Sequence, residues 1–237
     1  MKTIFITGAN RGLGLEFAKQ YSMQGHNIIG TARSKETANA LTSLPNTQVL
    51  ELDVSSTESI ANLTDQVGDR AIDLLINNAG VGDPSDAGLN ADPELWVNAF
   101  KVNCIGIVKV AEILEPNLVK SSKAIAATIG SQAGCLSVYR DDSKLIYRTT
   151  KAAANAASVL LSWHFKPLNI PYVTLRPGPT KTDLAGPNAQ FEVGDTISKL
   201  IAVLENVTME HTGLFLDRTG VVFPWLPEER WNVETVR

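Results

Sequence analysis

Tyr147 and Lys151 stand four residues apart in a stretch whose pattern predicts a helix over Ser143–Phe165. Residues at this spacing share one helix face, so the phenol and the ammonium would lie side by side. A free tyrosine has a pKa of about 10, and a neighbouring ammonium favours its phenolate form. Such a pair could exchange a proton with an alcohol or carbonyl oxygen. The same spacing is common by chance on amphipathic helix faces, so the pair needs support from other residues.

Two further polar residues provide that support. Ser131 follows a predicted strand over Lys123–Ile129, where its hydroxyl could hold a substrate oxygen. Asn103 lies within a predicted long helix, Pro93–Val119, although asparagine has a poor helix propensity. It could cap a locally broken turn or hold a water through its carbonyl; a packed or surface polar residue is the alternative.

A glycine-rich turn near the N-terminus predicts a dinucleotide site. The first predicted strand, Thr3–Thr7, leads directly into Gly8-Ala9-Asn10-Arg11-Gly12-Leu13-Gly14 and then a predicted helix. Without Cβ atoms the backbone can approach a pyrophosphate, and the helix N-terminus stabilises its charge. The spacing is GxxxGxG rather than the commoner GxGxxG, and a plain strand–helix turn is the alternative.

The end of the second predicted strand, Asn27–Ala32, indicates which cofactor would bind. NAD sites commonly carry an acidic residue here for the ribose 2′-hydroxyl, whereas this chain has Arg33. A guanidinium could pair with a 2′-phosphate, and Arg11 is a second cation on the same side. We therefore expect NADP(H) in preference to NAD(H); two solvated surface arginines are the alternative.

Two more predicted strands end in polar or small residues. Asp53, followed by Val54, could accept a hydrogen bond from the adenine amino group or cap the turn at Ser55-Ser56. The fourth strand ends in Asn77-Asn78-Ala79-Gly80, which suits a ligand-facing turn or an ordinary loop.

Strands and helices alternate along the chain. The strands are nearly continuous in apolar residues, which is typical of a parallel sheet covered on both faces. The expected strands are Thr3–Thr7, Asn27–Ala32, Gln48–Asp53, Asp73–Asn77, Lys123–Ile129, Pro171–Arg176 and Gly213–Asp217. The expected helices are Gly12–Gln24, Lys35–Ser43, Thr57–Gly68, Pro93–Val119, Ser143–Phe165 and Val193–Asn206. This order predicts an α/β fold with a doubly wound sheet, in one domain over residues 1–237.

Composition excludes several classes of partner. The 237 residues carry a net charge of −4, which argues against nucleic acid or an anionic membrane as a partner. No apolar run is long enough for a membrane helix, and no signal peptide pattern is present, so we expect a soluble cytoplasmic protein. The two cysteines and three histidines have no metal-ligand spacing, so no metal is expected.

The motifs together resemble those of the short-chain dehydrogenase/reductase family, over residues 1 to about 185. The matching segments are Thr7–Gly14, Asp53, Asn77–Gly80, Asn103, Ser131, Tyr147–Lys151 and Arg176–Thr182, in the order and near the spacing of the family. The start and the Tyr147–Lys151 segment further resemble sniffer-type carbonyl reductases and bacterial C-factor-like members. The resemblance implies a Rossmann-type sheet of about seven parallel strands with helices on both faces, and a homodimer or homotetramer formed through long helices.

It also implies roles for individual residues. Ser131 would position the substrate oxygen, Tyr147 would donate or remove its proton, Lys151 would lower the tyrosine pKa and bind the nicotinamide ribose, and Asn103 would maintain a proton-relay water. Pro177 and Gly178 would shape the nicotinamide pocket. Thr180 would contact the carboxamide, although the family usually has Val or Ile at this position. Thr182 would lie near the carboxamide or phosphates. The expected cofactor-binding residues are Gly8, Asn10, Arg11, Gly12, Leu13, Gly14, Arg33, Asp53, Val54, Asn78, Ala79, Gly80, Tyr147, Lys151, Pro177, Gly178, Thr180 and Thr182.

Substrate loops are expected at about 135–146 and 179–191. The tail with Pro224, Trp225 and Trp231 could cover the pocket or a subunit interface, or be plain packing. The expected function is NADP(H)-linked hydride transfer between nicotinamide and a small carbonyl or alcohol. The alternative is a cofactor-binding signalling or regulatory protein with little turnover.

Overall fold

Seven parallel strands form one sheet in a computed structural model that describes residues 1–82, 86, 88–139 and 141–225. The strands are β1 (Thr3–Ile6), β2 (Asn27–Ala32), β3 (Thr47–Glu51), β4 (Leu74–Asn77), β5 (Ile125–Ile129), β6 (Tyr172–Arg176) and β7 (Phe215–Asp217). Their spatial order is β3-β2-β1-β4-β5-β6-β7, so the chain winds outward in both directions from β1 and β4. This confirms the expected doubly wound sheet. Ligands of such sheets bind where the winding reverses, at the carboxyl ends of these central strands.

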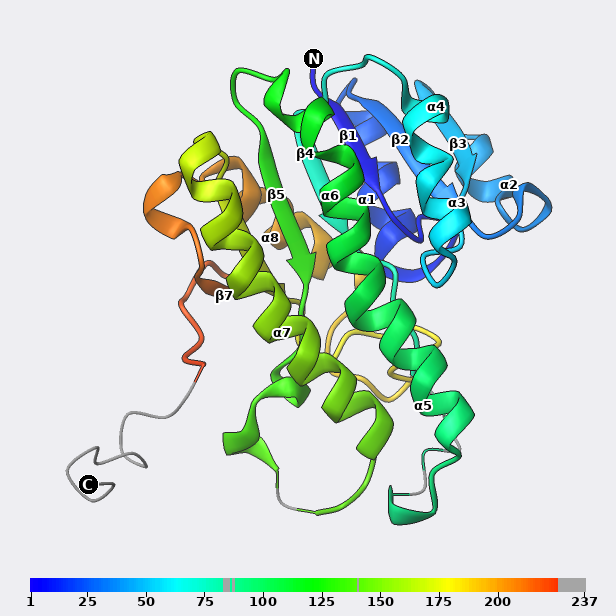
Figure 1. The fold of residues 1–237 in the computed structure, drawn as a ribbon, viewed down its shortest axis with the longest axis vertical. Coiled ribbons are helices and arrows are strands. Elements are labelled where there is room, and N and C mark those ends of the chain that lie inside the picture. The colour runs from blue at the N-terminus through cyan, green and yellow to red at the C-terminus, as the bar shows by residue number, and fades with distance from the viewer. Residues whose placement is uncertain (83–85, 87, 140, 226–237) are drawn as a thin grey trace.

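Helices cover both faces of the sheet (Figure 1). One face carries α1 (Gly12–Met23), α2 (Asn39–Thr42) and α8 (Val193–Glu205). The other carries α3 (Thr57–Ala61), α4 (Leu63–Val67), α6 (Gly106–Val119) and α7 (Leu145–Phe165), and α5 (Pro93–Phe100) precedes α6. Among the described residues, no helix is long and apolar enough to cross a membrane. A cytoplasmic location stays a prediction.

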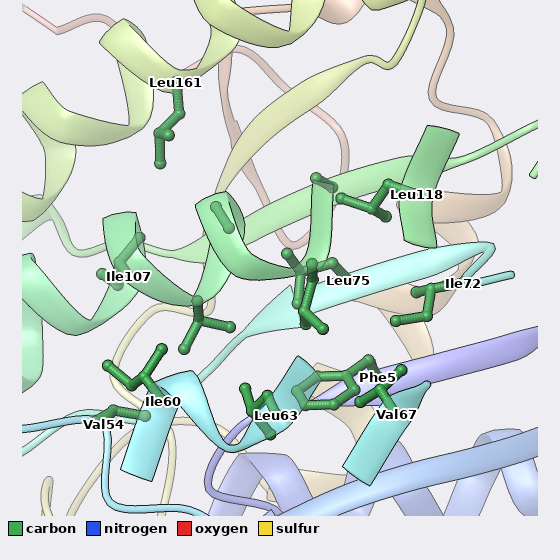
Figure 2. Close-up of a cluster of buried hydrophobic side chains, with 14 of the residues drawn as sticks. Phe5, Val54, Ile60, Leu63, Val67, Ile72, Leu75, Ile107, Leu118 and Leu161 are labelled. Atoms are coloured by element: carbon green, nitrogen blue, oxygen red, sulfur yellow. The ribbon is translucent and has the colours of Figure 1, made fainter. Parts of the chain in front are cut away.

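The strand pattern explains the two cores. Along β1, Ile4 and Ile6 pack toward α1 and α8, whereas Phe5 packs toward α4 and α6. Figure 2 shows Phe5 and Leu75 among side chains of α4 and α6, such as Leu63 and Leu118. Burying one such side chain stabilises the fold by roughly 1.5–3 kcal/mol. Because both faces are buried, the strands are apolar at nearly every position, as the sequence indicated.

Three expected helices are interrupted. Lys35–Ser43 forms a short 3-10 turn and then α2, and Thr57–Gly68 is divided at Asn62 into α3 and α4. The long helix expected over Pro93–Val119 contains a π-helical turn at Lys101–Ile105, between α5 and α6. Pro116 lies inside α6, which continues to Val119.

The remaining side chains of interest are structural. Cys135 is buried as expected and Cys104 is half-buried; burial raises the pKa of both thiols, which makes them poor nucleophiles. No group of three or more metal-ligating side chains lies together in the described part of the chain. Trp225 stacks on Phe215 with ring centroids 4.6 Å apart, which indicates packing for this part of the tail. Arg140 and Trp231 lie outside the described residues.

Candidate active site

Tyr147 lies in the first turn of α7. This helix begins after Lys144, whose φ of 55° turns the chain sharply into the helix. The backbone N–H of Tyr147 donates to the Asp86 carboxylate at 3.0 Å, so a residue from the segment after β4 caps the helix start. A Cβ on Gly82 would lie 3.3 Å from the Tyr147 ring, so this segment passes directly beside the phenol. Asp86 gave no recognisable sequence signal.

Ser131 follows β5 and faces α7. The side chain of Asn155, in α7, makes two hydrogen bonds to the backbone of Ser131. The Asn155 amide donates to Ser131 O at 3.0 Å, and Ser131 N–H donates to Asn155 Oδ1 at 3.4 Å. The loop after Ser131 packs closely on α7: a Cβ on Gly134 would lie only 2.5 Å from the Lys151 backbone, so there is no room for a side chain. The Ser131 side chain lies close enough to the Tyr147 phenol to lower its pKa. Asn155 was missed from the sequence, although an asparagine inside a helix signals a polar contact.

Asn103 occupies the π-helical turn and is fully buried. Its side-chain carbonyl accepts from Val81 N–H at 2.8 Å, and its amide donates to Val81 O at 2.9 Å and to Thr150 Oγ1 at 3.0 Å. It therefore ties the segment after β4 to α7, and a surface position is excluded. Both side-chain groups take part in these contacts, and the role of holding a relay water stays a prediction.

Lys151 is only 4% exposed, and its Nζ donates to Ile129 O at 3.0 Å. A Cβ on Gly80 would lie 3.3 Å from Asn103 Oδ1 and 3.5 Å from Lys151 Nζ, so Gly80 borders both side chains. These contacts bring Gly80, Asn103 and Lys151 to one place at the carboxyl edge of the sheet.

The pKa values of the tyrosine and lysine move in opposite directions. Burial lowers the pKa of Lys151 from 10.5 to about 8, because the protein interior disfavours the charged form. Burial raises the pKa of Tyr147, and the Ser131 side chain opposes this in part. We expected the ammonium to lower the tyrosine pKa; in the protein without cofactor, desolvation of the phenol raises it. The phenol is therefore protonated at neutral pH.

The glycine loop has the geometry of an anion-binding cradle. Gly8 and Gly12 have φ of 62° and 55°, and a Cβ on Gly14 would lie 2.3 Å from Gly8 O. At the start of α1, Arg11 makes no side-chain cap, so the first amides of that helix have no side-chain acceptor. These features fit a dinucleotide pyrophosphate.

Asn78 and Ala79 hold the ends of β1 and β4 together. Thr7 Oγ1 accepts both backbone N–H groups at 2.9 Å, and the Asn78 amide donates to Thr7 O at 2.9 Å and Gly8 O at 3.0 Å. These contacts hold the turn against the glycine loop, and a ligand-facing role for it stays a prediction.

The residues expected near the adenosine are partly brought together. Arg33 is exposed at the end of β2. Asp53 Oδ1 accepts from Ser55 N–H at 2.9 Å and Ser55 Oγ at 2.7 Å, so it does cap that turn; Val54 beside it is buried. Arg11 instead pairs with Asp183 at 2.9 Å, and is directed toward the segment after Thr182 rather than toward Arg33.

The segment after β6 borders both the glycine loop and Tyr147. Thr182 lies 3.7 Å from where a Gly12 Cβ would be, and Leu184 contacts Gly82 beside the Tyr147 ring. Gly178, which follows Pro177, has φ of 78°. The Thr180 hydroxyl is buried 3.2 Å from Thr196 Oγ1, so its predicted contact with a carboxamide gains no support from the side chain.

Similarity to known proteins agrees with this arrangement. Residues 2–192 match the short chain dehydrogenase family. The sequence is 32% identical over 154 residues to the C-signal protein of Myxococcus xanthus, covering 65% of this chain and 93% of that protein. It is 26% identical over 248 residues to an uncharacterized oxidoreductase of Schizosaccharomyces pombe, covering 94% and 98%.

Solved structures are similar over nearly the whole chain. The carbonyl reductase Sniffer of D. melanogaster has a TM-score of 0.87 at 25% identity, covering 95% of this chain and 100% of that one. The NADPH-bound carbonyl reductase from chicken fatty liver has a TM-score of 0.86 at 26% identity, covering 95% and 99%. The family match extends over more than half of the sequence, and the chain belongs to the short-chain dehydrogenase/reductase family.

Proposed function

We propose that this oxidoreductase reduces small aldehydes or ketones with NADPH, and that Tyr147 supplies the proton. The observation that carries the proposal is that Tyr147, Ser131 and the buried Lys151 lie together at the carboxyl edge of the sheet, where its ligand crevice lies, and that desolvation raises the pKa of the phenol. A phenol that holds its proton is prepared to act as a general acid, which is what carbonyl reduction requires.

Each residue of the candidate site has its own role in the proposed reaction. Ser131 holds the carbonyl oxygen, and Tyr147 transfers its proton to that oxygen. Lys151, when charged, stabilises the phenolate that forms and binds the nicotinamide ribose. Asn103 keeps the segment after β4 against α7, so that Gly80 and Lys151 stay together. NADPH, when bound, supplies the hydride to the carbonyl carbon.

A preference for NADPH over NADH rests on Arg33. Its guanidinium is exposed at the end of β2, where an acid would repel a 2′-phosphate. The NADPH in the chicken carbonyl reductase is consistent with this preference. Arg11 contributes less than expected from its position, because Asp183 pairs with it.

A signalling or regulatory role with little turnover is the alternative, and the C-signal relative in Myxococcus xanthus keeps it testable. It is not favoured, because a binding module has no need of a tyrosine and a buried lysine beside Ser131. A homodimer or homotetramer is proposed from the family resemblance.

The test is NADPH oxidation with a panel of small aldehydes and ketones, for the wild type and Tyr147→Phe. We expect Tyr147→Phe to abolish turnover and to leave NADPH affinity nearly unchanged. Tyr21→Phe is the matched control, because it removes a buried phenol from α1 on the opposite face of the sheet. Preserved turnover in Tyr147→Phe, or tight NADPH binding by the wild type with no carbonyl reduced, would overturn the proposal.

A further inference from the structure

A cavity of about 280 Å³ opens at the carboxyl ends of β6 and β7. We call it the β6–β7 cavity; its walls include Gln132, Arg176, Gly178, Phe191, Arg218 and Thr219. Most of these side chains are polar or charged, which differs from the apolar walls usual for small-molecule pockets. None of the roles proposed above uses its two arginines.

Arg176, the last residue of β6, is incompletely satisfied. Its Nη2 donates to Gln132 Oε1, and its guanidinium carbon lies 4.5 Å from the centre of the Phe223 ring. Its Nε is buried and has no hydrogen-bond partner in the structure. Burial lowers the pKa of Arg176, although the carboxylate of Asp217 opposes this. A guanidinium in this state gains more from an entering anion than a solvated one does.

Arg218 brings a second guanidinium to the same cavity. It pairs with Asp195 at 3.1 Å and lies 3.7 Å over the Phe191 ring. Its charge also disfavours that of Arg176, so two like charges are held close together. Asp217 also lines the cavity, and its Oδ1 accepts from Thr219 and Val221. With Asp195 paired to Arg218 the formal charges balance, so the cavity offers an anion two guanidinium groups rather than a net positive charge.

The cavity adjoins the proposed reaction site. Gln132 directly follows Ser131, and the short 3-10 turn Gln132–Gly134 starts from a cap by the Ser131 hydroxyl, which accepts from Ala133 N–H. The loop that holds the substrate oxygen thus also forms one wall of the cavity. A carbonyl compound bound at Ser131 could extend its other end toward Arg176.

We propose that the β6–β7 cavity binds a carboxylate carried by the substrate, so that this protein prefers carbonyl compounds with an acid group to neutral ones. A carboxylate is planar and can accept from the guanidinium groups of Arg176 and Arg218, which both line the cavity. The preference for acidic carbonyl substrates rests on the proposed carbonyl reduction. The binding of a carboxylate rests on the cavity alone.

The kinetic test compares para-carboxybenzaldehyde with the neutral para-formylbenzamide, using the full chain and NADPH. We expect the wild type to favour the acid by about tenfold in kcat/KM, since one charge-assisted hydrogen bond is of that order. Arg176→Gln and Arg218→Gln should each reduce the preference and leave the neutral substrate within about twofold of the wild type. Lys109→Gln is the matched control, because it removes one positive charge from α6 outside the cavity.

The binding test needs no turnover. Benzoate and benzamide are titrated into the NADPH-loaded protein by calorimetry, and benzoate should bind more tightly in the wild type and Lys109→Gln but not in Arg176→Gln or Arg218→Gln. Benzoate binding no tighter than benzamide, or unchanged by both arginine substitutions, overturns the inference even if neutral carbonyls are reduced. Arginine-dependent benzoate binding without any carbonyl turnover supports the anion site and rejects the proposed function. Arg218→Gln keeps the test decisive if Arg176→Gln does not fold.

Discussion

Lys151→Met should make the protein without cofactor more stable at pH 7, while removing its activity. Lys151 is buried without a carboxylate partner, and its Nζ has one described acceptor, Ile129 O. Methionine has nearly the same length and carries no charge, so it can fill the space without the desolvation cost.

The expected gain follows from the pKa. A fall from 10.5 to about 8 on folding corresponds to a cost of about 3 kcal/mol for keeping the ammonium charged in the folded protein. Loss of the hydrogen bond to Ile129 O subtracts about 1 kcal/mol, which leaves a gain of about 2 kcal/mol for Lys151→Met. For a chain of this size, that gain raises Tm by roughly 4–8 °C.

The pH dependence identifies the cause. Between about pH 8 and pH 10.5 the unfolded chain binds a proton at Lys151 that the folded chain has released, so wild-type stability rises with pH in this window. The advantage of Lys151→Met should therefore shrink by about 1.4 kcal/mol per pH unit above pH 8. Urea unfolding at pH 7, 8.5 and 9.5 measures it, with the exposed Lys109→Met as control. A less stable Lys151→Met at pH 7, or an advantage that does not change with pH, would refute the reasoning.

Arg33→Ala should weaken NADPH binding by about tenfold and NADH binding much less, measured by fluorescence titration; equal weakening of both would contradict the 2′-phosphate role. Asn103→Ala removes three buried hydrogen bonds and should lower the free energy of unfolding by about 3 kcal/mol in urea titrations; a loss below 1 kcal/mol would contradict its role in tying α7 to the segment after β4. Trp163, 66% exposed on α7, should lie in a subunit interface, so Trp163→Asp should reduce the mass measured by light scattering, and an unchanged oligomer would exclude this face.

The sheet was predictable because both of its faces are buried. Residues such as Ile4, Phe5 and Ile6 must all be apolar when alternate side chains enter two different cores. The glycine loop was predictable for a similar reason: Gly8 and Gly12 adopt positive φ, and Gly14 has no room for a Cβ. Their spacing in the sequence directly reflects the local backbone.

The interruptions and the polar contacts were harder to predict. The π-helical turn at Lys101–Ile105 depends on Asn103 bonding to Val81 and Thr150, which are distant in the sequence. The Asp86 cap on α7 and the pairing of Arg11 with Asp183 also join remote segments. Periodicity reports neighbours along one element, whereas these contacts depend on how elements pack.

The pKa of Tyr147 also could not be predicted from the spacing of residues in the sequence. The spacing of Tyr147 and Lys151 was correct for one helix face, yet the pKa of Tyr147 is raised because the phenol is desolvated. Sequence spacing indicates which charges are near, but desolvation depends on everything packed around them. Here burial dominates, and it keeps the proton on the tyrosine.

Incompletely compensated polar groups gather at one edge of the molecule. Among the described residues, the buried side-chain atoms without a hydrogen-bond partner are Asp86 Oδ1 and Arg176 Nε, and Lys151 is a buried cation whose pKa is lowered by desolvation alone. Asp86 caps the helix start at Tyr147, Arg176 ends β6, and Lys151 donates to the last residue of β5, so all three lie near the carboxyl edge of the sheet. Other buried polar groups, such as Asn77 and Thr128, are paired with Tyr172. Folding alone would favour replacing the unpaired groups with apolar ones, so their concentration at this edge agrees with the ligands proposed above, a dinucleotide and a carbonyl substrate.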